Sequence, residues 1–160
     1  MTKPPCFLII AALALSLAAC RPDPATLVHE YRQVRGEEGW NVRDTIRIAV
    51  PAAPRDGDYR LAVGMRVTNA FSWEGVWVEA ELQVDTPRVR HVDTLFVRLY
   101  DEQARPLTEG VNLLQVEQPA PKTLHLRKGQ KGSLRLRHLM RRETLPYITD
   151  VGAAIQQQNK

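Results

Sequence analysis

The segment Tyr59–Thr68, which reads Tyr-Arg-Leu-Ala-Val-Gly-Met-Arg-Val-Thr, decides the fold. Large apolar side chains occupy every second position from Tyr59 to Val67, and small or polar residues fill the positions between them. An alternation with a period of two is typical of a β-strand with one buried face. The segment therefore predicts a long, half-buried strand.

The same alternation recurs on both sides of this segment. It predicts strands over the ranges Asp44–Val50, Val76–Val84, His91–Tyr100, Thr123–Arg127, Gly132–Met140 and Thr149–Gln157. Leu27–Val34 can be read as a strand, which we favour, or as one or two helical turns. Asp101–Pro121 reads as a long irregular stretch with a short edge strand at Val111–Val116, and Lys128–Gly132 resembles a hairpin loop. Many short strands separated by turns, with no convincing internal helix, predict an all-β fold, an antiparallel β-sandwich.

The N-terminus has the organisation of an export signal. Lys3 supplies a positive charge, Phe7–Leu17 is apolar but too short to span a bilayer, and Leu17-Ala18-Ala19-Cys20 resembles the bacterial lipobox. We therefore expect a helical lipoprotein signal peptide over residues 1–19 and lipid attachment at Cys20. We also expect a lipidated tether over 20–26, a single β-sandwich domain over 27–157 and a frayed tail over 158–160.

The residues that carry catalysis in other proteins are sparse after Cys20. Ser72 and Ser133 are the only serines there, and no histidine is spaced to serve them as a base. His91 and Asp93 share a strand face, but a zinc site would need further ligands. We predict no catalytic residue, no metal and no cofactor.

Positive charge is concentrated late in the chain. The residues are Lys122, Arg127, Lys128, Lys131, Arg135, Arg137, Arg141 and Arg142. Nucleic acid is not an expected partner of an exported protein, whereas lipid headgroups or an acidic partner are possible ones. We favour a solvated sheet face, with Arg135 and Arg137 paired across strands to Glu79 or Glu81. The two glutamates share one strand face, which also invites a glycosidase interpretation that we give little weight.

Two tryptophans admit a ligand-binding interpretation. Trp73 lies in a loop beside Gly75, and an exposed Trp73 would give a carbohydrate-binding β-sandwich lipoprotein. Trp77 alternates with valines and so lies on the face opposite to theirs, where it would cover a second core layer. We favour packing roles for both and keep carbohydrate binding as the alternative function.

Three stretches resemble the GldH family of gliding-motility lipoproteins of the Bacteroidetes. The first is Arg66–Val78, with a Thr-Asn pair, spaced aromatic residues and Trp77 inside the next strand. The second is Asp93-Thr94-Leu95, and the third is His138–Arg142 followed by Leu145–Gly152. Gly39-Trp40 and the lipobox also fit, so that the resemblance spans nearly the whole exported chain.

The resemblance implies a non-enzymatic, lipid-anchored envelope protein. It would be an accessory component of gliding motility and type IX secretion, with the membrane and other envelope proteins of that machinery as partners. The motif residues with a possible partner-binding or structural role are Arg66, Trp77, Met140, Arg141, Asp150 and Gly152.

Two further expectations concern the motif arginines and the membrane. A structural role for Arg141 and Arg142 would be an arginine–carboxylate bond to Asp150. Among the four residues just after Cys20, Arg21-Pro22-Asp23-Pro24, Asp23 is the one acidic residue and an arginine stands near it, whereas surface-displayed lipoproteins of this group tend to carry an acidic cluster there. We therefore expect an outer-membrane protein that faces the periplasm.

Overall fold

A computed structural model describes residues 23–35 and 38–158 of the chain. The expected signal peptide and Cys20 lie outside the described residues. The described residues form strands joined by turns and loops, with no helix among them. The strands are β1 (Thr26–Gln33), β2 (Trp40–Asn41), β3 (Ile46–Val50), β4 (Gly57–Thr68), β5 (Gly75–Val84), β6 (Val89–Arg98), β7 (Leu113–Leu126), β8 (Gly132–His138), β9 (Thr144–Leu145) and β10 (Ile148–Gln157).

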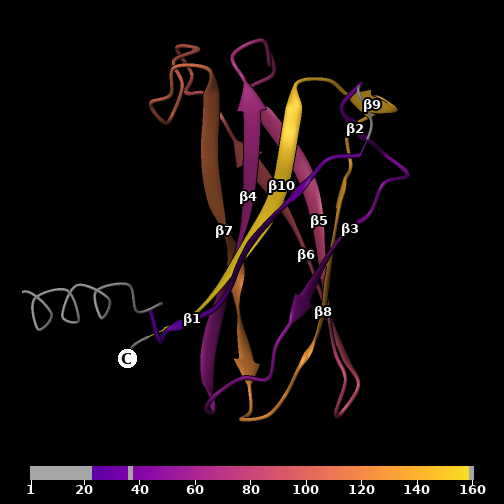
Figure 1. Ribbon diagram of the computed structural model, residues 1–160, viewed down its shortest axis with the longest axis vertical. Helices are drawn as coiled ribbons and strands as arrows, with labels where there is room; N and C mark the ends of the chain where they lie inside the picture. Colours follow the sequence, from indigo (N-terminus) through magenta and orange to yellow (C-terminus); the bar gives the residue numbers. More distant parts are fainter. Residues whose placement is uncertain (1–22, 36–37, 159–160) are drawn as a thin grey trace, which may run out of the picture.

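Eight of these strands build two antiparallel sheets of four (Figure 1). The first sheet has the order β1-β10-β4-β7, and the second has the order β3-β8-β5-β6. The short strands β2 and β9 pair with each other at one end of the molecule. The predicted antiparallel β-sandwich is confirmed.

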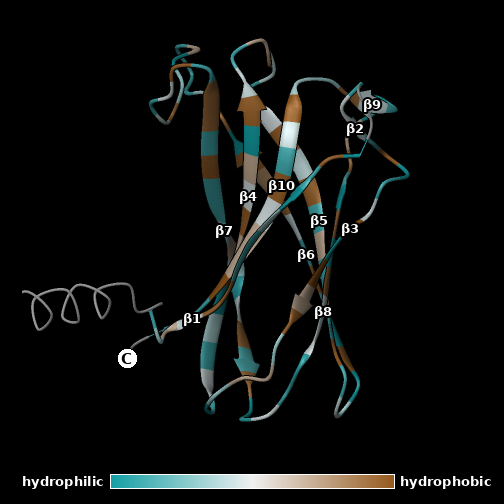
Figure 2. Cartoon of the chain, in the orientation of Figure 1, coloured by the Kyte–Doolittle hydropathy of each residue, from teal (hydrophilic) through white to brown (hydrophobic). Residues whose placement is uncertain are grey.

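The core lies between the two sheets and follows the alternation seen in the sequence (Figure 2). On β4, all five apolar residues from Tyr59 to Val67 are at most 3% exposed. On β5, Val76, Val78, Ala80, Leu82 and Val84 are buried in the same way from the opposite sheet. Full burial of one such side chain stabilises the fold by roughly 1.5–3 kcal/mol, so these two strands carry much of the stability.

The strands expected at Val111–Val116, at an edge, and at Thr123–Arg127 are parts of one strand, and the irregular stretch expected between them was wrong. A single strand, β7, runs from Leu113 to Leu126 and includes both Pro119 and Pro121. The two prolines are tolerated because β7 is an edge strand, and because the pairing of β7 with β4 shifts register between Arg60 and Ala62, opposite these prolines. Prolines are confined to edges and bulges because they cannot donate a ladder hydrogen bond.

The predicted hairpin loop at Lys128–Gly132 was also wrong. This segment joins β7 of the first sheet to β8 of the second, and β8 pairs with β3 and β5 instead. The segment does form a turn, in which Gly129 has a φ of 83°. What the local sequence does not specify is that the chain changes sheets here.

The outer strands of the two sheets meet along one side of the sandwich. Lys122 of β7 lies 2.9 Å from the carboxylate of Asp93 on β6, and its ammonium also donates to the carbonyl of Val92.

Among the described residues, no helix is long and apolar enough to cross a membrane.

Candidate functional site

The outer face of the first sheet is organised around Tyr31 on β1. In the strand register, Tyr31 stands beside Gly152 on β10, and Gly152 stands beside Gly64 on β4. The aromatic ring lies over these two glycines: a Cβ at Gly64 would come within 2.6 Å of Tyr31 Cζ, and one at Gly152 within 2.7 Å of Tyr31 Cγ. Both positions therefore require glycine so that the ring can lie flat on the sheet.

Polar contacts hold this ring in place. The Tyr31 hydroxyl donates to Glu117 Oε1 at 2.8 Å, and His29 Nε2 lies 2.9 Å from the same oxygen. The guanidinium of Arg66 stacks over the ring, with its Cζ 4.3 Å from the centroid. Burial, reinforced by the hydrogen bond to Glu117, raises the pKa of the Tyr31 hydroxyl well above its ordinary value of 10.0. The hydroxyl is therefore a permanent donor and is not poised for acid–base chemistry.

Arg66 connects this ring to the last strand. Its Nε donates to Gln115 at 2.8 Å, and its Nη1 lies 4.0 Å from Asp150 Oδ1. Three of the predicted motif residues, Arg66, Asp150 and Gly152, thus meet in one place, which we call the Tyr31 cluster (Tyr31, Gly64, Arg66, Glu117, Asp150 and Gly152). The arginine–carboxylate bond to Asp150 exists, but its arginine is Arg66 and not Arg141 or Arg142.

The outer face of the second sheet presents a pair of aromatic residues. Trp77 on β5 is 48% exposed, and its ring centroid lies 5.1 Å from that of Phe96 on the neighbouring strand β6. Leu139, 41% exposed, donates its backbone N–H to the carbonyl of Trp77 at 2.8 Å. Met140 Sδ lies 3.5 Å from the backbone nitrogen of Trp77. These four residues, Trp77, Phe96, Leu139 and Met140, form what we call the aromatic patch.

Of two other predicted residues, Arg141 adjoins this patch and Trp73 lies outside it. Arg141 follows Met140 directly and is exposed. Trp73 is half-buried and packs against the core, with its ring centroid 5.1 Å from that of Phe71 and the Arg142 guanidinium carbon 5.5 Å from its centroid. The packing role was therefore right for Trp73 and wrong for Trp77. Trp73 is not the open stacking surface that the carbohydrate alternative needs.

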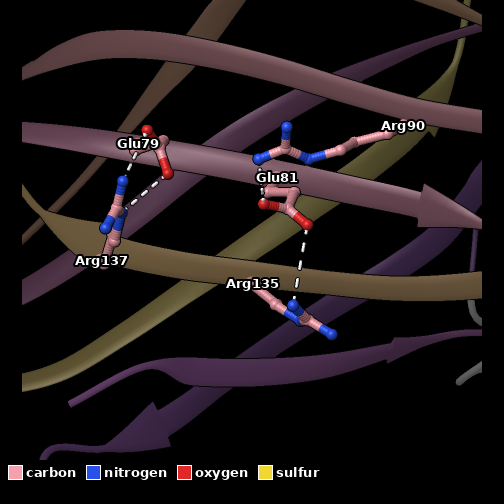
Figure 3. Close-up of polar contacts among 5 residues, drawn as sticks. All are labelled: Glu79, Glu81, Arg90, Arg135 and Arg137. Atoms are coloured by element: carbon pink, nitrogen blue, oxygen red, sulfur yellow. Dashed lines mark hydrogen bonds and ion pairs between the residues drawn. The ribbon is translucent and has the colours of Figure 1, made fainter. Parts of the chain in front are cut away.

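A network of arginines and glutamates continues along the same face (Figure 3). Arg137 on β8 donates to both oxygens of Glu79 on β5, at 2.7 and 3.1 Å. Glu81 accepts from Arg90 at 2.7 Å and lies 3.7 Å from Arg135. The predicted cross-strand pairing of Arg135 and Arg137 with these glutamates is confirmed.

This network also bears on the glycosidase interpretation. The hydrogen bond from Arg90, with the positive charge of the surrounding arginines, holds the pKa of Glu81 below its ordinary value. A general acid of a glycosidase needs a raised pKa, and arginines shift it the other way. The two glutamates act as counter-ions.

The remaining candidates for chemistry are kept apart or engaged. Asp93 is bound by Lys122 and so does not present a free carboxylate beside His91. Over residues 23–35 and 38–158, no group of three or more histidine, cysteine, aspartate or glutamate side chains is placed to hold a metal ion.

His138 is a functional candidate that the sequence analysis overlooked. It is 1% exposed and occupies the last inward position of β8 after Leu134 and Leu136, with its ring 5.2 Å from that of Trp40. Neither ring nitrogen has a hydrogen bond of good geometry within the described residues. Burial lowers the pKa of His138, although the nearby backbone of Trp40 and Glu143 opposes the shift. The alternation of β8 was the signal that could have placed it in the core.

Comparisons with known proteins identify the family. No curated protein matches the chain. A family 35 carbohydrate-binding module from Clostridium thermocellum is similar in structure, with a TM-score of 0.39 and 15% identity, over 84% of this chain and 93% of that one. A likeness at that score carries no argument about function. The family model described as GldH lipoprotein matches residues 26–155. The chain therefore belongs to the GldH lipoprotein family, whose members are lipid-anchored envelope proteins associated with gliding motility.

Proposed function

We propose that this lipoprotein is a non-enzymatic accessory component of the gliding-motility and type IX secretion machinery. In this proposal it docks another envelope protein through the aromatic patch. The observation that carries the docking role is the exposure of Trp77, at 48%, on an open sheet face beside Phe96. Large aromatic side chains that remain accessible to water are the residues that most often dominate the binding energy of protein interfaces.

The surroundings of the patch support protein docking. Arg98 lies at its edge, with its guanidinium carbon 5.9 Å from the centroid of Phe96. Met140 is partly buried and packs against the core, so it anchors the patch to the fold. Tryptophan, arginine and methionine are all enriched at interfaces relative to other surfaces. Trp77 and Met140, which were singled out from the family motif, meet here although they are distant in the sequence.

Crosslinking in native envelopes, followed by affinity capture of the lipoprotein, tests the proposal. Trp77→Ala should abolish capture of a specific envelope partner and reduce secretion by the machinery, while the variant stays folded. Leu107→Ala is the matched control, because Leu107 is equally exposed at 50% but lies outside the patch. Capture of the same partner by Trp77→Ala and by the wild type would refute the docking role.

Carbohydrate binding receives less support from the geometry than protein docking does. The Trp73 ring on which that alternative depended is packed on Phe71 and approached by Arg142. Binding on a glycan array that Trp73→Ala abolishes would restore it.

The orientation at the membrane is part of the same proposal. We place the lipid anchor at Cys20 in the outer membrane and the domain on the periplasmic side, since Arg21-Pro22-Asp23-Pro24, the four residues just after Cys20, include a single acidic residue. Protease added to intact cells should leave the domain whole. Its removal would show that the domain is displayed on the cell surface.

A further inference from the structure

A cleft at the end of β1 gathers arginines from segments that are distant along the chain. It has a volume of about 670 Å³, and the residues that line it are Arg32, Gln33, Arg35, Arg43, Asp44, Thr45, Ile46 and Arg47. The set holds four arginines against one aspartate. Arginine keeps its charge at any physiological pH and donates in a fork that fits the oxygens of a phosphate or carboxylate.

The nearby carboxylates do not neutralise this charge. Arg32 is paired with Glu30, and Arg43 approaches Glu143 only at 3.7 Å, with both of these side chains mostly in solvent. The side chain of Arg47, on β3, makes no hydrogen bond or ion pair with another described residue. The described residues that line the cleft therefore hold more guanidinium groups than carboxylates.

The outer face of the second sheet, next to the cleft, adds to the excess of positive charge. Arg47 stands directly opposite Arg135 in the pairing of β3 with β8, and like charges in that arrangement repel each other. Arg135 shares Glu81 with Arg90, and its Nε atom is buried without a partner among the described residues. Thr45 lines both the cleft and the hollow formed by Glu79, Glu81, Arg90, Arg135 and Arg137, so the two spaces are neighbours.

We propose that this arginine cleft binds a phosphate group. A doubly charged oxyanion between Arg43 and Arg47 would supply the acceptors that the cleft lacks and relieve the repulsion between Arg47 and Arg135. Several guanidinium groups converging on one space favour a dianion such as phosphate over a single carboxylate. The site is separate from the aromatic patch and does not depend on the docking role.

The place of the cleft favours a phosphate that is soluble or carried by another molecule over a headgroup of the anchoring membrane. Arg32 lies six residues beyond Thr26, where β1 begins, which is about 20 Å along an extended strand. In Figure 1, β1 starts beside the end of β10 and runs from there toward β2 and β3. The cleft is thus at the end of β1 that lies farther from the expected tether.

Calorimetric titration of the full-length lipoprotein in a non-ionic detergent tests the proposal. The probes are pyrophosphate, acetate as a carboxylate, and the soluble short-chain lipid dihexanoyl phosphatidylglycerol. We expect saturable binding of pyrophosphate, weaker binding of the lipid and none of acetate. Arg47→Gln should weaken the binding of pyrophosphate by about tenfold.

Arg60→Gln is the matched control, because Arg60 is an exposed strand arginine on the other sheet and its loss changes the net charge equally. It should leave the affinity unchanged. Equal weakening by both variants would show a general charge effect and overturn the site. Absence of saturable pyrophosphate binding would overturn it as well, and binding of phosphatidylglycerol alone would replace the soluble phosphate with a membrane headgroup. Because Arg47 is exposed, a circular dichroism spectrum suffices to confirm that its variant is folded.

Discussion

The outer faces of the two sheets differ in how far their side chains satisfy one another. On the first sheet, Tyr31 fills the space over two glycines, and its hydroxyl, Arg66 and Asp150 make their contacts within the face. On the second sheet, Trp77 remains half-exposed, and Arg47 has no partner among the described residues. A face whose groups are mutually satisfied serves the fold, whereas a face with exposed aromatic rings and surplus charge is suited to binding.

The motif residues of the family fall into two groups, one on each of these outer faces. Arg66, Asp150 and Gly152 belong to the Tyr31 cluster, and Trp77 and Met140 belong to the aromatic patch, with Arg141 beside it. Substitutions in the first group should act on stability. Substitutions of Trp77 and Arg141 should act on binding and leave stability nearly unchanged, whereas substitution of Met140, which packs against the core, should also lower stability.

The largest effect is expected at the glycines under Tyr31. Gly152→Ala should lower the free energy of unfolding by about 1–3 kcal/mol, because the new methyl group meets both the Tyr31 ring and the backbone oxygen of Glu30. Gly64→Ala meets the Tyr31 side chain, so its cost should largely disappear in a Tyr31→Ala background, whereas that of Gly152→Ala should persist. Urea unfolding of the single and double variants measures both. Equal costs of Gly64→Ala in the two backgrounds would contradict the role of the ring.

The next effect is a pH dependence at His138. Burial lowers its pKa in the folded state below its ordinary value of 6.5, so below that pH the unfolded chain binds a proton that the folded chain refuses. The stabilisation is complete above pH 6.5 and is lost as the pH falls toward the folded-state pKa. His138→Phe should remove this part of the acid destabilisation. Between pH 7 and pH 5 the free energy of unfolding of the variant should therefore rise relative to that of the wild type, by about 1.4 kcal/mol for each unit by which the folded-state pKa of His138 is lowered. Thermal unfolding at several pH values is the measurement, and parallel curves for the two proteins would show that His138 does not titrate as proposed.

A smaller effect is expected from Tyr31→Phe. The ring remains over the glycines, and the hydrogen bond to Glu117 at 2.8 Å is lost. We expect a loss of about 0.5–1.5 kcal/mol in the free energy of unfolding. A loss as large as that of Gly152→Ala would mean that the hydroxyl, and not the ring, holds the face together.

The smallest effect on stability is expected at Arg141. It is exposed and has no ion pair within the described residues, so Arg141→Ala should change the free energy of unfolding by about 0.5 kcal/mol or less. Arg66→Ala, which removes the contacts to Tyr31, Gln115 and Asp150, is the contrasting variant and should cost more. Chemical unfolding that ranks Arg141→Ala above Arg66→Ala would reverse the assignment of the two faces.

The alternation of apolar residues was enough to predict the strands and the sandwich. It placed Tyr59 to Val67 on one buried face, and the structure agrees. It divided β7 into two strands, because Pro119 and Pro121 suggest an interruption unless the strand is known to lie at an edge with a bulge. Which strands neighbour each other is a property of the whole chain, and this explains the error at Lys128–Gly132.

The candidate sites were less predictable for the same reason. Glycines at 64 and 152 become a single feature only when the register of three strands brings them under Tyr31. The exposure of Trp77 depends on whether another layer covers its face, and the sequence pattern is the same in both cases. Arg135 and Arg137 were placed correctly opposite Glu79 and Glu81, because alternation and complementary charge pointed to the same pairing.

The division between the two faces is tested most directly by a photo-crosslinking amino acid placed at two matched threonines. Thr94 lies on the outer face of the second sheet, on the same strand as Phe96, and Thr123 lies on the outer face of the first sheet. Both are exposed. Irradiation of native envelopes should give a specific crosslinked product from position 94 and none from position 123. A product from position 123 alone would contradict the account, since it would place the partner on the face that we assign to stability.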